Sequence, residues 1–203
     1  MELRAERLSR GEVTLEPMDE RHRDGLRAAA NADPDIWTIY PYSMADEHFD
    51  GFWARLMDQR AAGDRMPFAV CVNGECVGIS CYLNIGREAA GVEIGGTYYR
   101  PDVRGGIVNP TAKLLLIGHA FACGARRVAF RVDAINARSR AAVLKLGAVE
   151  EGILRQNSVT WTGRVRDTVV FSILRDEWPA VEKRLLERSS PHERPSTSLG
   201  TSV

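Results

Sequence analysis

A glycine-rich segment near the middle of the chain combines the residue types that hold a phosphate group. Residues 92–100, VEIGGTYYR, have the composition of a strand that contains a double glycine. Residues 101–110, PDVRGGIVNP, follow directly and place an arginine and two more glycines ahead of a helix start. A helix N-terminus at the end of a strand offers free backbone N–H groups, which attract anions. The segment therefore predicts a site for a phosphate-bearing cofactor, although an Arg-Gly-Gly loop is also typical of a flexible turn.

The elements around this segment predict one domain of mixed α/β structure. Apolar runs bounded by turn residues such as Asn73-Gly74 indicate strands, and apolar residues at helical spacing behind N-cap residues such as Asp19 and Asn109 indicate helices. Strands 92–100 and 127–132 are expected to be joined by a right-handed parallel crossover, or to form a parallel pair that splays at the double glycine. The expectation is a mixed α/β sheet of about seven strands. The expected strands are 13–16, 68–72, 76–85, 92–100, 127–132, 151–161 and 165–174, and the expected helices are 18–30, 46–62, 109–123, 137–146 and 176–188.

The overall composition argues against several classes of protein. The 203 residues include 27 Lys and Arg and 27 Asp and Glu, so no net charge draws the chain to nucleic acid or to a membrane surface. No stretch approaches the roughly 18 consecutive apolar residues of a membrane span, and the charged opening residues MELRAER are unlike a secretory signal. A cytoplasmic protein with no nucleic-acid or membrane partner is therefore expected.

The cysteines and histidines give no sign of a metal site. None of the four cysteines forms a C-x-x-C pair, and the four histidines are scattered along the sequence. Cys71 and Cys76 flank the turn at Asn73-Gly74, so a two-residue hairpin would set them opposite each other, where a cross-strand disulfide could form. In a reducing compartment we expect free thiols instead.

A second segment makes the interpretation of the first more specific. Residues 132–155 read VDAINARSRAAVLKLGAVEEGILR, in which Asn and Ser open a helix that ends at Leu-Gly. Together with Glu93-Ile94-Gly95 and the loop, this segment resembles the GNAT family of acetyl-CoA-dependent N-acetyltransferases, and within it the RimJ/RimL-type branch, which acetylates protein N-termini. The resemblance covers about residues 13–178. It implies a GNAT-like fold, with a mostly antiparallel central sheet and a splayed parallel pair, and an N-acetyltransferase domain over residues 11–188. The composition of residues 189–203, rich in Ser, Thr and Pro, favours a disordered tail.

The resemblance also implies how acetyl-CoA, the expected co-substrate, is bound without a metal. The splayed strand near Gly95 would hold the pantetheine arm, and Asn136 would contact the cofactor, although Asn136 is equally suited to cap a helix. Two residues depart from the family's loop. Asp102 puts an acid beside a pyrophosphate and Ile107 puts a branched side chain where the backbone approaches it, so either the loop is rearranged or binding is weak. The backbone amides expected to hold the pyrophosphate are those of Val103, Arg104, Gly105, Gly106, Ile107 and Val108, with the helix from Asn109 behind them.

Two residues are expected to act on protons during acetyl transfer. The acceptor amine must lose a proton before it attacks the thioester, because amines are mostly protonated near neutral pH. Glu93 stands where the family often has a glutamate base, and partial burial would raise its pKa; alternatively, it only pairs with a nearby arginine. Ser139 stands where relatives of the N-terminal branch have a serine that serves the leaving thiolate, while Val143 replaces the tyrosine of many family members. Ser139 is also compatible with a small residue that only lets the cofactor pass.

The acceptor site is predicted from aromatic residues ahead of the second helix. Trp37, Tyr40 and Tyr42 lie on the side that covers the acceptor in relatives, whereas Phe49 and Trp53 favour core packing. An aromatic-walled pocket suits an amine-bearing small molecule or a protein N-terminus. A homodimer is one expected assembly, because homodimers are common among relatives. Two other interpretations stay open: a catalytically silent acyl-CoA-binding module, and a nucleotide-binding protein, although the loop has no Lys-Ser/Thr of a P-loop.

Overall fold

The chain folds around one eight-stranded sheet. The structure is a computed structural model that describes residues 1–86 and 88–189. The strand order across the sheet is β1-β2-β3-β4-β5-β6-β8-β7, in which β5 and β6 run parallel and the other neighbouring pairs are antiparallel. This confirms the mixed α/β fold with a mostly antiparallel sheet. The strands are β1 (Leu8–Arg10), β2 (Val13–Pro17), β3 (Arg65–Val72), β4 (Glu75–Gly86), β5 (Gly91–Tyr99), β6 (Arg127–Asp133), β7 (Val149–Val159) and β8 (Val165–Leu174).

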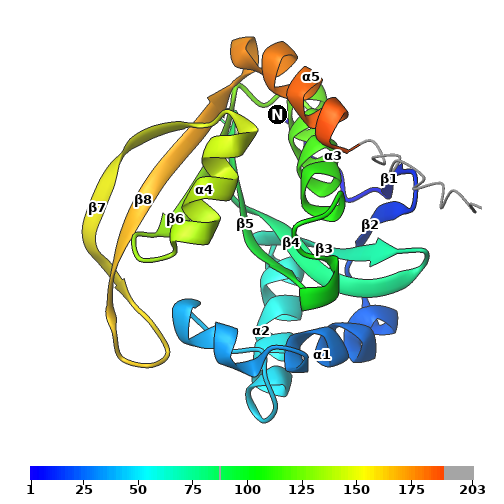
Figure 1. The fold of residues 1–203 in the computed structure, drawn as a ribbon, viewed down its shortest axis with the longest axis vertical. Helices are drawn as coiled ribbons and strands as arrows, with labels where there is room; N and C mark the ends of the chain where they lie inside the picture. The colour runs from blue at the N-terminus through cyan, green and yellow to red at the C-terminus, as the bar shows by residue number, and fades with distance from the viewer. Residues whose placement is uncertain (87, 190–203) are drawn as a thin grey trace, which may run out of the picture.

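Helices cover both faces of the sheet (Figure 1). The helices α3 and α5 pack together on one side, and α1 and α2 pack on the other side, over β4 and β3. The pleat of β3 separates the two layers, because Phe68 and Val70 join the cluster on the α3 side while Ala69 and Cys71 join the cluster on the α1–α2 side. The helices are α1 (Arg23–Asn31), α2 (His48–Ala62), α3 (Val108–Ala122), α4 (Ala137–Leu146) and α5 (Trp178–Arg188), with 3-10 helices at Glu20–His22, Pro34–Ile39, Pro101–Val103 and Arg175–Glu177.

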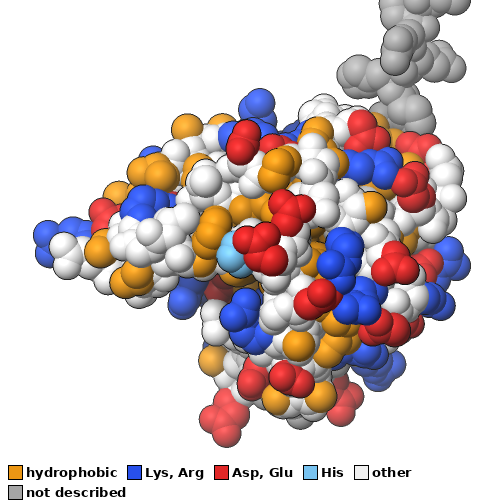
Figure 2. Space-filling model, turned by 90° about the horizontal axis from the view of Figure 1, so that it is seen from below, with side chains coloured by type: hydrophobic (Ala, Val, Ile, Leu, Met, Phe, Trp, Pro, Cys, Tyr) orange, Lys and Arg blue, Asp and Glu red, His pale blue; other side chains and the backbone are white. Residues whose placement is uncertain are grey.

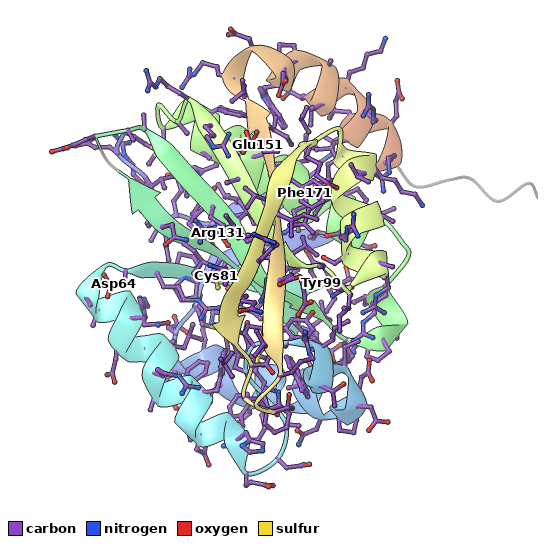
Figure 3. All side chains as sticks on the ribbon, turned by 90° about the vertical axis from the view of Figure 1, so that its left-hand side faces the viewer. Asp64, Cys81, Tyr99, Arg131, Glu151 and Phe171 are labelled. Atoms are coloured by element: carbon purple, nitrogen blue, oxygen red, sulfur yellow. The ribbon has the colours of Figure 1, made fainter. Side chains whose placement is uncertain are left out.

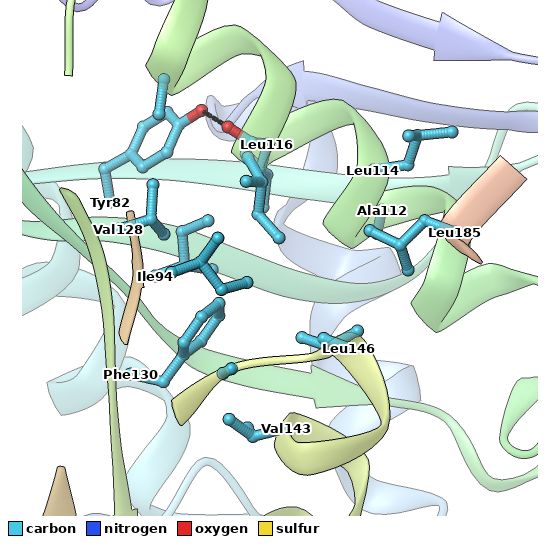
Figure 4. Close-up of a cluster of buried hydrophobic side chains, with 14 of the residues drawn as sticks. Tyr82, Ile94, Ala112, Leu114, Leu116, Val128, Phe130, Val143, Leu146 and Leu185 are labelled. Carbon is cyan, nitrogen blue, oxygen red and sulfur yellow. Dashed lines mark hydrogen bonds between the residues drawn. The ribbon is translucent and has the colours of Figure 1, made fainter. Parts of the chain in front are cut away.

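The larger hydrophobic cluster lies on the α3 side of the sheet, and part of it is drawn in Figure 4. There the hydroxyl of Tyr82 donates to the carbonyl of Leu116 at 2.6 Å, which joins β4 to the middle of α3. Helix α3 is apolar on several sides because it is enclosed by the sheet and by α5. This packing fixes the direction of α3 and so determines where its N-terminus lies.

The two parallel strands separate after three paired residues. Pairing ends at Glu93 of β5 and Ala129 of β6, beyond which β5 follows β4 and β6 follows β8. Between Gly95 and Tyr98, β5 has one residue more than the facing part of β4, and Gly96 takes a φ of +58° there. The double glycine therefore marks a β-bulge beside a splayed parallel pair, as the sequence predicts.

The first expected helix, 18–30, is divided in the structure. The carboxylate of Asp19 accepts a hydrogen bond from the N–H of Arg21 at 3.2 Å and caps a 3-10 turn, and α1 begins only at Arg23. The sheet also has one strand more than expected. The additional strand, β1, has three residues, which are too few to show an alternation of apolar and polar positions.

The start of α3 also differs from the expectation. The helix begins at Val108, and the cap position is taken by Ile107 with no side-chain hydrogen bond, so Asn109 is not the N-cap. Pro110 does not define the first residue of the helix. Proline lacks an N–H, and none of the N–H groups in the first turn has an acceptor within the helix, so proline fits any position of that turn.

The structure bears on the remaining expectations as follows. The four cysteines are free thiols, and Cys71 and Cys76 face each other across the β3–β4 hairpin without a disulfide. None of the helices in the described part of the chain has the length and hydrophobicity that a membrane span requires. Within residues 1–86 and 88–189, no three His, Cys, Asp or Glu side chains are grouped so that they could hold a metal ion. Of the tail predicted over residues 189–203, only Ser189 is among the described residues.

Candidate active site

The N-terminus of α3 presents a row of backbone N–H groups. The first hydrogen bond of the helix runs from the N–H of Thr111 to the carbonyl of Ile107 at 3.0 Å. The N–H groups ahead of it have no acceptor among the described residues, and a Cβ added at Gly105 or Gly106 would meet no atom within 4 Å. Such an arrangement binds phosphate oxygens. The free N–H groups are those of Gly105, Gly106, Ile107, Val108 and Asn109.

Val103 and Arg104 differ from the rest of the predicted phosphate loop. Their N–H groups donate to carbonyl groups of the preceding 3-10 turn, each at 3.2 Å. The side chain of Arg104 turns back into the protein, where Nε donates to the carbonyl of Tyr99 at 2.7 Å and the guanidinium pairs with Asp33. These two residues therefore shape the loop, while the free N–H groups begin at Gly105.

The two unusual residues of the loop fit its geometry. Asp102 turns toward Arg100, whose guanidinium donates to the carboxylate at 2.7 and 2.9 Å and holds the pKa of Asp102 below its usual range. Ile107 has a φ of −75° and a ψ of −17°, which is ordinary helical backbone, and the positive φ of the loop, +79°, falls on Gly105. The acid is thus paired within the loop, and the branched residue needs no strained conformation.

Glu93 lies at the splay, on the face of the sheet opposite α3, because its neighbours Val92 and Ile94 face α3. Its buried side chain accepts a hydrogen bond at Oε2 from Nδ2 of Asn84 at 2.7 Å, and Oε2 lies 3.3 Å from Nε of Arg131. Oε1 has no hydrogen-bond partner among the described residues. Burial raises the pKa of Glu93, and the hydrogen bond from Asn84 and the charge of Arg131 oppose that shift. A carboxyl group with a raised pKa is suited to accept a proton near neutral pH.

Asn136 and Ser139 lie where β6 leads into α4. The Oδ1 atom of Asn136 accepts a hydrogen bond from the N–H of Ser139 at 2.9 Å, so Asn136 is the N-cap of α4 as predicted. The hydroxyl of Ser139 has no hydrogen-bond partner in the described ranges. Val143, one turn further along α4, is buried in the core. A contact of Asn136 or Ser139 with a cofactor stays a prediction.

The three aromatic residues predicted for the acceptor site have different surroundings. Trp37 is fully buried and its Nε1 donates to the carbonyl of Ala30 at 3.1 Å, so its ring belongs to the core. The hydroxyl of Tyr40 donates to the carbonyl of Thr97 at 2.9 Å, next to the bulge. Tyr42 lines a cavity of about 730 Å³.

This cavity lies between α2 and the β7–β8 hairpin. Helix α2 contributes His48, the hairpin contributes Trp161 and β3 contributes Arg65. The rings of His48 and Trp161 are 5.0 Å apart between centroids, so the tip of the hairpin closes against the start of α2. Figure 2 views the molecule from below, and there the side on which β7 and β8 lie projects to the left from the rest of the molecule. Phe49 and Trp53 are buried in the core cluster, as expected.

Arg65 is a residue of this site that the sequence analysis missed. It begins β3, and its Nε donates to Sγ of Cys81 at 3.2 Å, while its guanidinium reaches Gly96 in the bulge. In the view of Figure 3, Cys81 appears between the C-terminal end of α2 and the β7–β8 strands, and the side chain of Arg131 overlaps these strands. The sequence contains a signal for this position. Arg65 is four residues before Ala69 in β3 and therefore lies on the same face of the strand, which is covered by α1 and α2.

Lys113 is a second buried cation that the sequence analysis missed. Its Nζ donates to Oγ1 of Thr97 at 2.8 Å and to Oγ of Ser80 at 3.3 Å, between α3 and the sheet. Burial lowers the pKa of Lys113 to about 7. Its signal in the sequence is a single charge within the apolar run 112–117, AKLLLI, on a helix that is buried on several sides.

The fold is that of an acetyltransferase. Residues 12–149 match the family model described as the acetyltransferase (GNAT) domain, and the chain belongs to this family. No curated protein matches the sequence.

Solved structures have the same fold. A GCN5-related N-acetyltransferase from Brucella melitensis is 28% identical with a TM-score of 0.86, and the match covers 95% of this chain and 89% of that chain. A protein from T. thermophilus described as an acetyltransferase is 33% identical with a TM-score of 0.84, and the match covers 94% and 100%. Mycobacterium smegmatis RimJ, in complex with CoA-disulfide, is 22% identical with a TM-score of 0.75 over 90% and 94%, which is a likeness of fold alone.

Proposed function

We propose that this protein transfers the acetyl group of acetyl-CoA to a primary amine. The observation that carries the proposal is the row of free N–H groups from Gly105 to Asn109, at the start of α3 and beside the splay of β5 and β6. A diphosphate bound to these groups leaves the pantetheine arm free to enter between the two strands, past Gly95. The backbone of the loop then positions acetyl-CoA. Gly105 is the residue of the loop whose type matters for this, because its φ is positive.

Glu93 is the general base of the proposed reaction. Its free Oε1 accepts a proton from the acceptor ammonium, directly or through a water molecule, and the neutral nitrogen attacks the thioester carbonyl carbon. A backbone N–H of the bulge, at Gly95 or Gly96, donates to the carbonyl oxygen as negative charge develops there. The C–N bond forms and the C–S bond breaks, and the nitrogen gives up its second proton to the departing thiolate. The hydroxyl of Ser139 relays this proton, accepting one and donating one, or donates a hydrogen bond to the sulfur.

The acceptor enters through the cavity between α2 and the β7–β8 hairpin. Tyr42 and Arg65 line that cavity, and Arg65 also reaches the bulge, so the cavity and the splay meet there. The acceptor classes we consider are a small-molecule amine and, as in the RimJ/RimL-type branch, a protein N-terminus. The volume of the cavity, about 730 Å³, and its place between α2 and the hairpin are compatible with both classes.

Thiol release from acetyl-CoA, measured with a panel of amines, tests this function. The wild-type protein should release thiol in the presence of an accepted amine, and Glu93→Gln should lower kcat by about 10²–10⁴-fold with little change in the affinity for coenzyme A. Ser139→Ala should lower kcat by about tenfold or more. A protein that binds coenzyme A but releases no thiol with any amine would be a silent acyl-CoA-binding module.

The setting of the enzyme completes the proposal. Its catalytic unit is taken to span residues 11–188, and its four free cysteines suit the reducing cytoplasm.

The assembly is a homodimer through the edge strand β7, where Val149, Ile153 and Val159 are each more than half exposed. Sedimentation of the full chain should give the mass of a dimer, and Ile153→Lys should return it to a monomer.

A further inference from the structure

The cavity beside the bulge contains a buried positive charge, Arg65, that is in direct contact with no carboxylate of the described residues. Arg65 is 9% exposed, and its guanidinium forms no ion pair with the described residues. Its Nε donates to Sγ of Cys81 at 3.2 Å and its Nη1 to Oε1 of Gln59 at 3.5 Å, but Nη2 has no hydrogen-bond partner among them. Buried charges are normally paired, because an unpaired one loses its hydration without compensation. Nη2 is therefore a donor available to a ligand in the cavity.

A second donor lies at the same place. Oη of Tyr42 is buried without a hydrogen-bond partner in the described part of the chain, and it lies 3.3 Å from the position that a Cβ on Gly96 would take. Nη2 of Arg65 lies against that same position. Two donors side by side match the two oxygens of one carboxylate, and a guanidinium–carboxylate pair is a strong charge-assisted interaction.

The nearby carboxylates of the protein are already paired with other arginines. Glu93 lies 3.3 Å from Arg131, and Asp133 accepts from Nη2 of Arg164 at 2.6 Å. The acid that lines the cavity, Glu47, is exposed. The surroundings of the bulge therefore carry a surplus of positive charge, which attracts an anionic group. The arginines of this region are Arg65, Arg131, Arg164 and Arg166, and the carboxylates among them are Glu93 and Asp133.

The proposed base and the two donors occupy neighbouring positions along β5. Oε1 of Glu93 lies 3.0 Å from the Cβ position of Gly95, and the donors of Arg65 and Tyr42 surround the Cβ position of Gly96. Consecutive Cα atoms are only about 3.8 Å apart. An amine that faces Glu93 and an anion that faces Arg65 would thus be separated by a few covalent bonds, as they are in an amino acid.

We propose that the acceptor amine carries a carboxylate a few bonds from its nitrogen, and that Arg65 and Tyr42 bind this carboxylate. The inference rests on the proposed acetyl transfer and specifies its substrate class. Free amino acids offer this chemistry, and so do peptides whose N-terminal residue has an acidic side chain. Bound in this way, the carboxylate neutralises Arg65 and holds the nitrogen beside Glu93.

The test compares acids with their carboxamides in the thiol-release assay, using the full chain. The acceptors are glycine and β-alanine against glycinamide and β-alaninamide, and, as a separate arm, peptides that begin with Asp against peptides that begin with Asn. In the wild type, the acids of one arm should have kcat/KM about 100-fold or more above their amides. Arg65→Gln should lower the ratio of kcat/KM between acid and amide to within about threefold of one, by raising KM for the acid.

Matched variants separate carboxylate binding from a structural role of Arg65. Arg10 is an exposed arginine of β1, at the far edge of the sheet. Arg10→Gln should keep the full preference for acids over amides. Tyr42→Phe should reduce the preference by about tenfold while the thermal unfolding midpoint stays the same. If Arg65→Gln does not fold, Arg65→Lys and Tyr42→Phe replace it, and unchanged preference in both overturns the proposal.

Two further results would overturn this inference alone. Equal kcat/KM for acids and amides in the wild type would show that no carboxylate is recognised. An equal loss for both in Arg65→Gln would show that the arginine only supports the bulge. Absence of thiol release with every amine would instead contradict the proposed acetyl transfer itself.

Discussion

Oε2 of Glu93 and Nε of Arg131 are 3.3 Å apart across the splay between β5 and β6. Their strands are paired only as far as Glu93 and Ala129, so the ion pair bridges the two strands where their backbones begin to separate. The buried carboxylate is thereby placed between a charge that favours its ionised form and a desolvated environment that opposes it. The balance between these effects sets the pH at which Glu93 can accept a proton.

Arg131→Gln should move the acidic limb of the pH–rate profile to higher pH. The arginine stabilises the ionised carboxylate, so its removal raises the pKa of Glu93 further, and a base with a higher pKa is protonated over more of the acidic range. We expect kcat/KM at pH 6 to fall several-fold while the value at pH 9 stays close to that of the wild type. Profiles that coincide, or a limb displaced to lower pH, would remove Glu93 from the titrating step.

Gly105→Ala should weaken coenzyme A binding more than Gly106→Ala does. Gly105 has a φ of +79°, which costs a residue with a Cβ about 1 kcal/mol or more, whereas no positive φ is found at Gly106. The substituted loop would shift away from the conformation that aligns its N–H groups, and the dissociation constant should rise about five- to tenfold. Calorimetric titration of both variants measures this, and equal affinities for the two would contradict the assigned loop geometry.

Asn136→Ala should lower the free energy of unfolding by about 1 kcal/mol, because α4 loses its N-cap hydrogen bond to Ser139. Asn136→Asp keeps an acceptor at the cap and should stay within about 0.5 kcal/mol of the wild type. Urea unfolding of the pair measures the capping contribution. Equal stabilities for Ala and Asp would refute the cap. Asn136→Ser keeps an uncharged acceptor at the cap, so a raised dissociation constant of coenzyme A in this variant would indicate a direct contact of Asn136 with the cofactor.

Lys113→Met should remove a pH dependence of stability. With a pKa of about 7 in the folded state and about 10.4 in the unfolded chain, Lys113 binds a proton only when unfolded across this interval, so the wild-type free energy of unfolding rises with pH there. Methionine has no such proton, and Ser80 and Thr97 remain hydrogen-bonded to each other at 2.8 Å. The free energy of unfolding of the wild type minus that of the variant, from urea unfolding, should therefore be larger at pH 9.5 than at pH 7. A constant difference would contradict the lowered pKa.

Much of the fold could be predicted because short-range signals agreed with the tertiary structure. Helix α4 has the predicted bounds, since Asn136 caps it and Gly147 ends it with a φ of +101°. The bulge was expected for a comparable reason, because Gly96 needs a positive φ. The start of α3 was missed by one residue, because Ile107 caps it without a side-chain signal.

The site was less predictable where its residues depend on distant contacts. The residue type of Trp37 predicts a place in the acceptor pocket, but its indole N–H donates to the carbonyl of Ala30 and its ring is buried. Arg65 gains its position only from the packing of β3 against β4 and the bulge of β5, which are separate in sequence. Local patterns therefore predict the bulge and the caps of the helices well, whereas the surroundings of Trp37 and Arg65 follow from packing between distant segments.

The most direct test of the central claim is an NMR titration of the ¹⁵N-labelled protein with coenzyme A. If the backbone at the start of α3 holds the diphosphate, the largest changes in amide shift should fall on Gly105, Gly106, Ile107, Val108 and Asn109, whose N–H groups have no acceptor among the described residues. Saturable binding whose largest changes lie elsewhere, or no change at millimolar coenzyme A, would contradict the account.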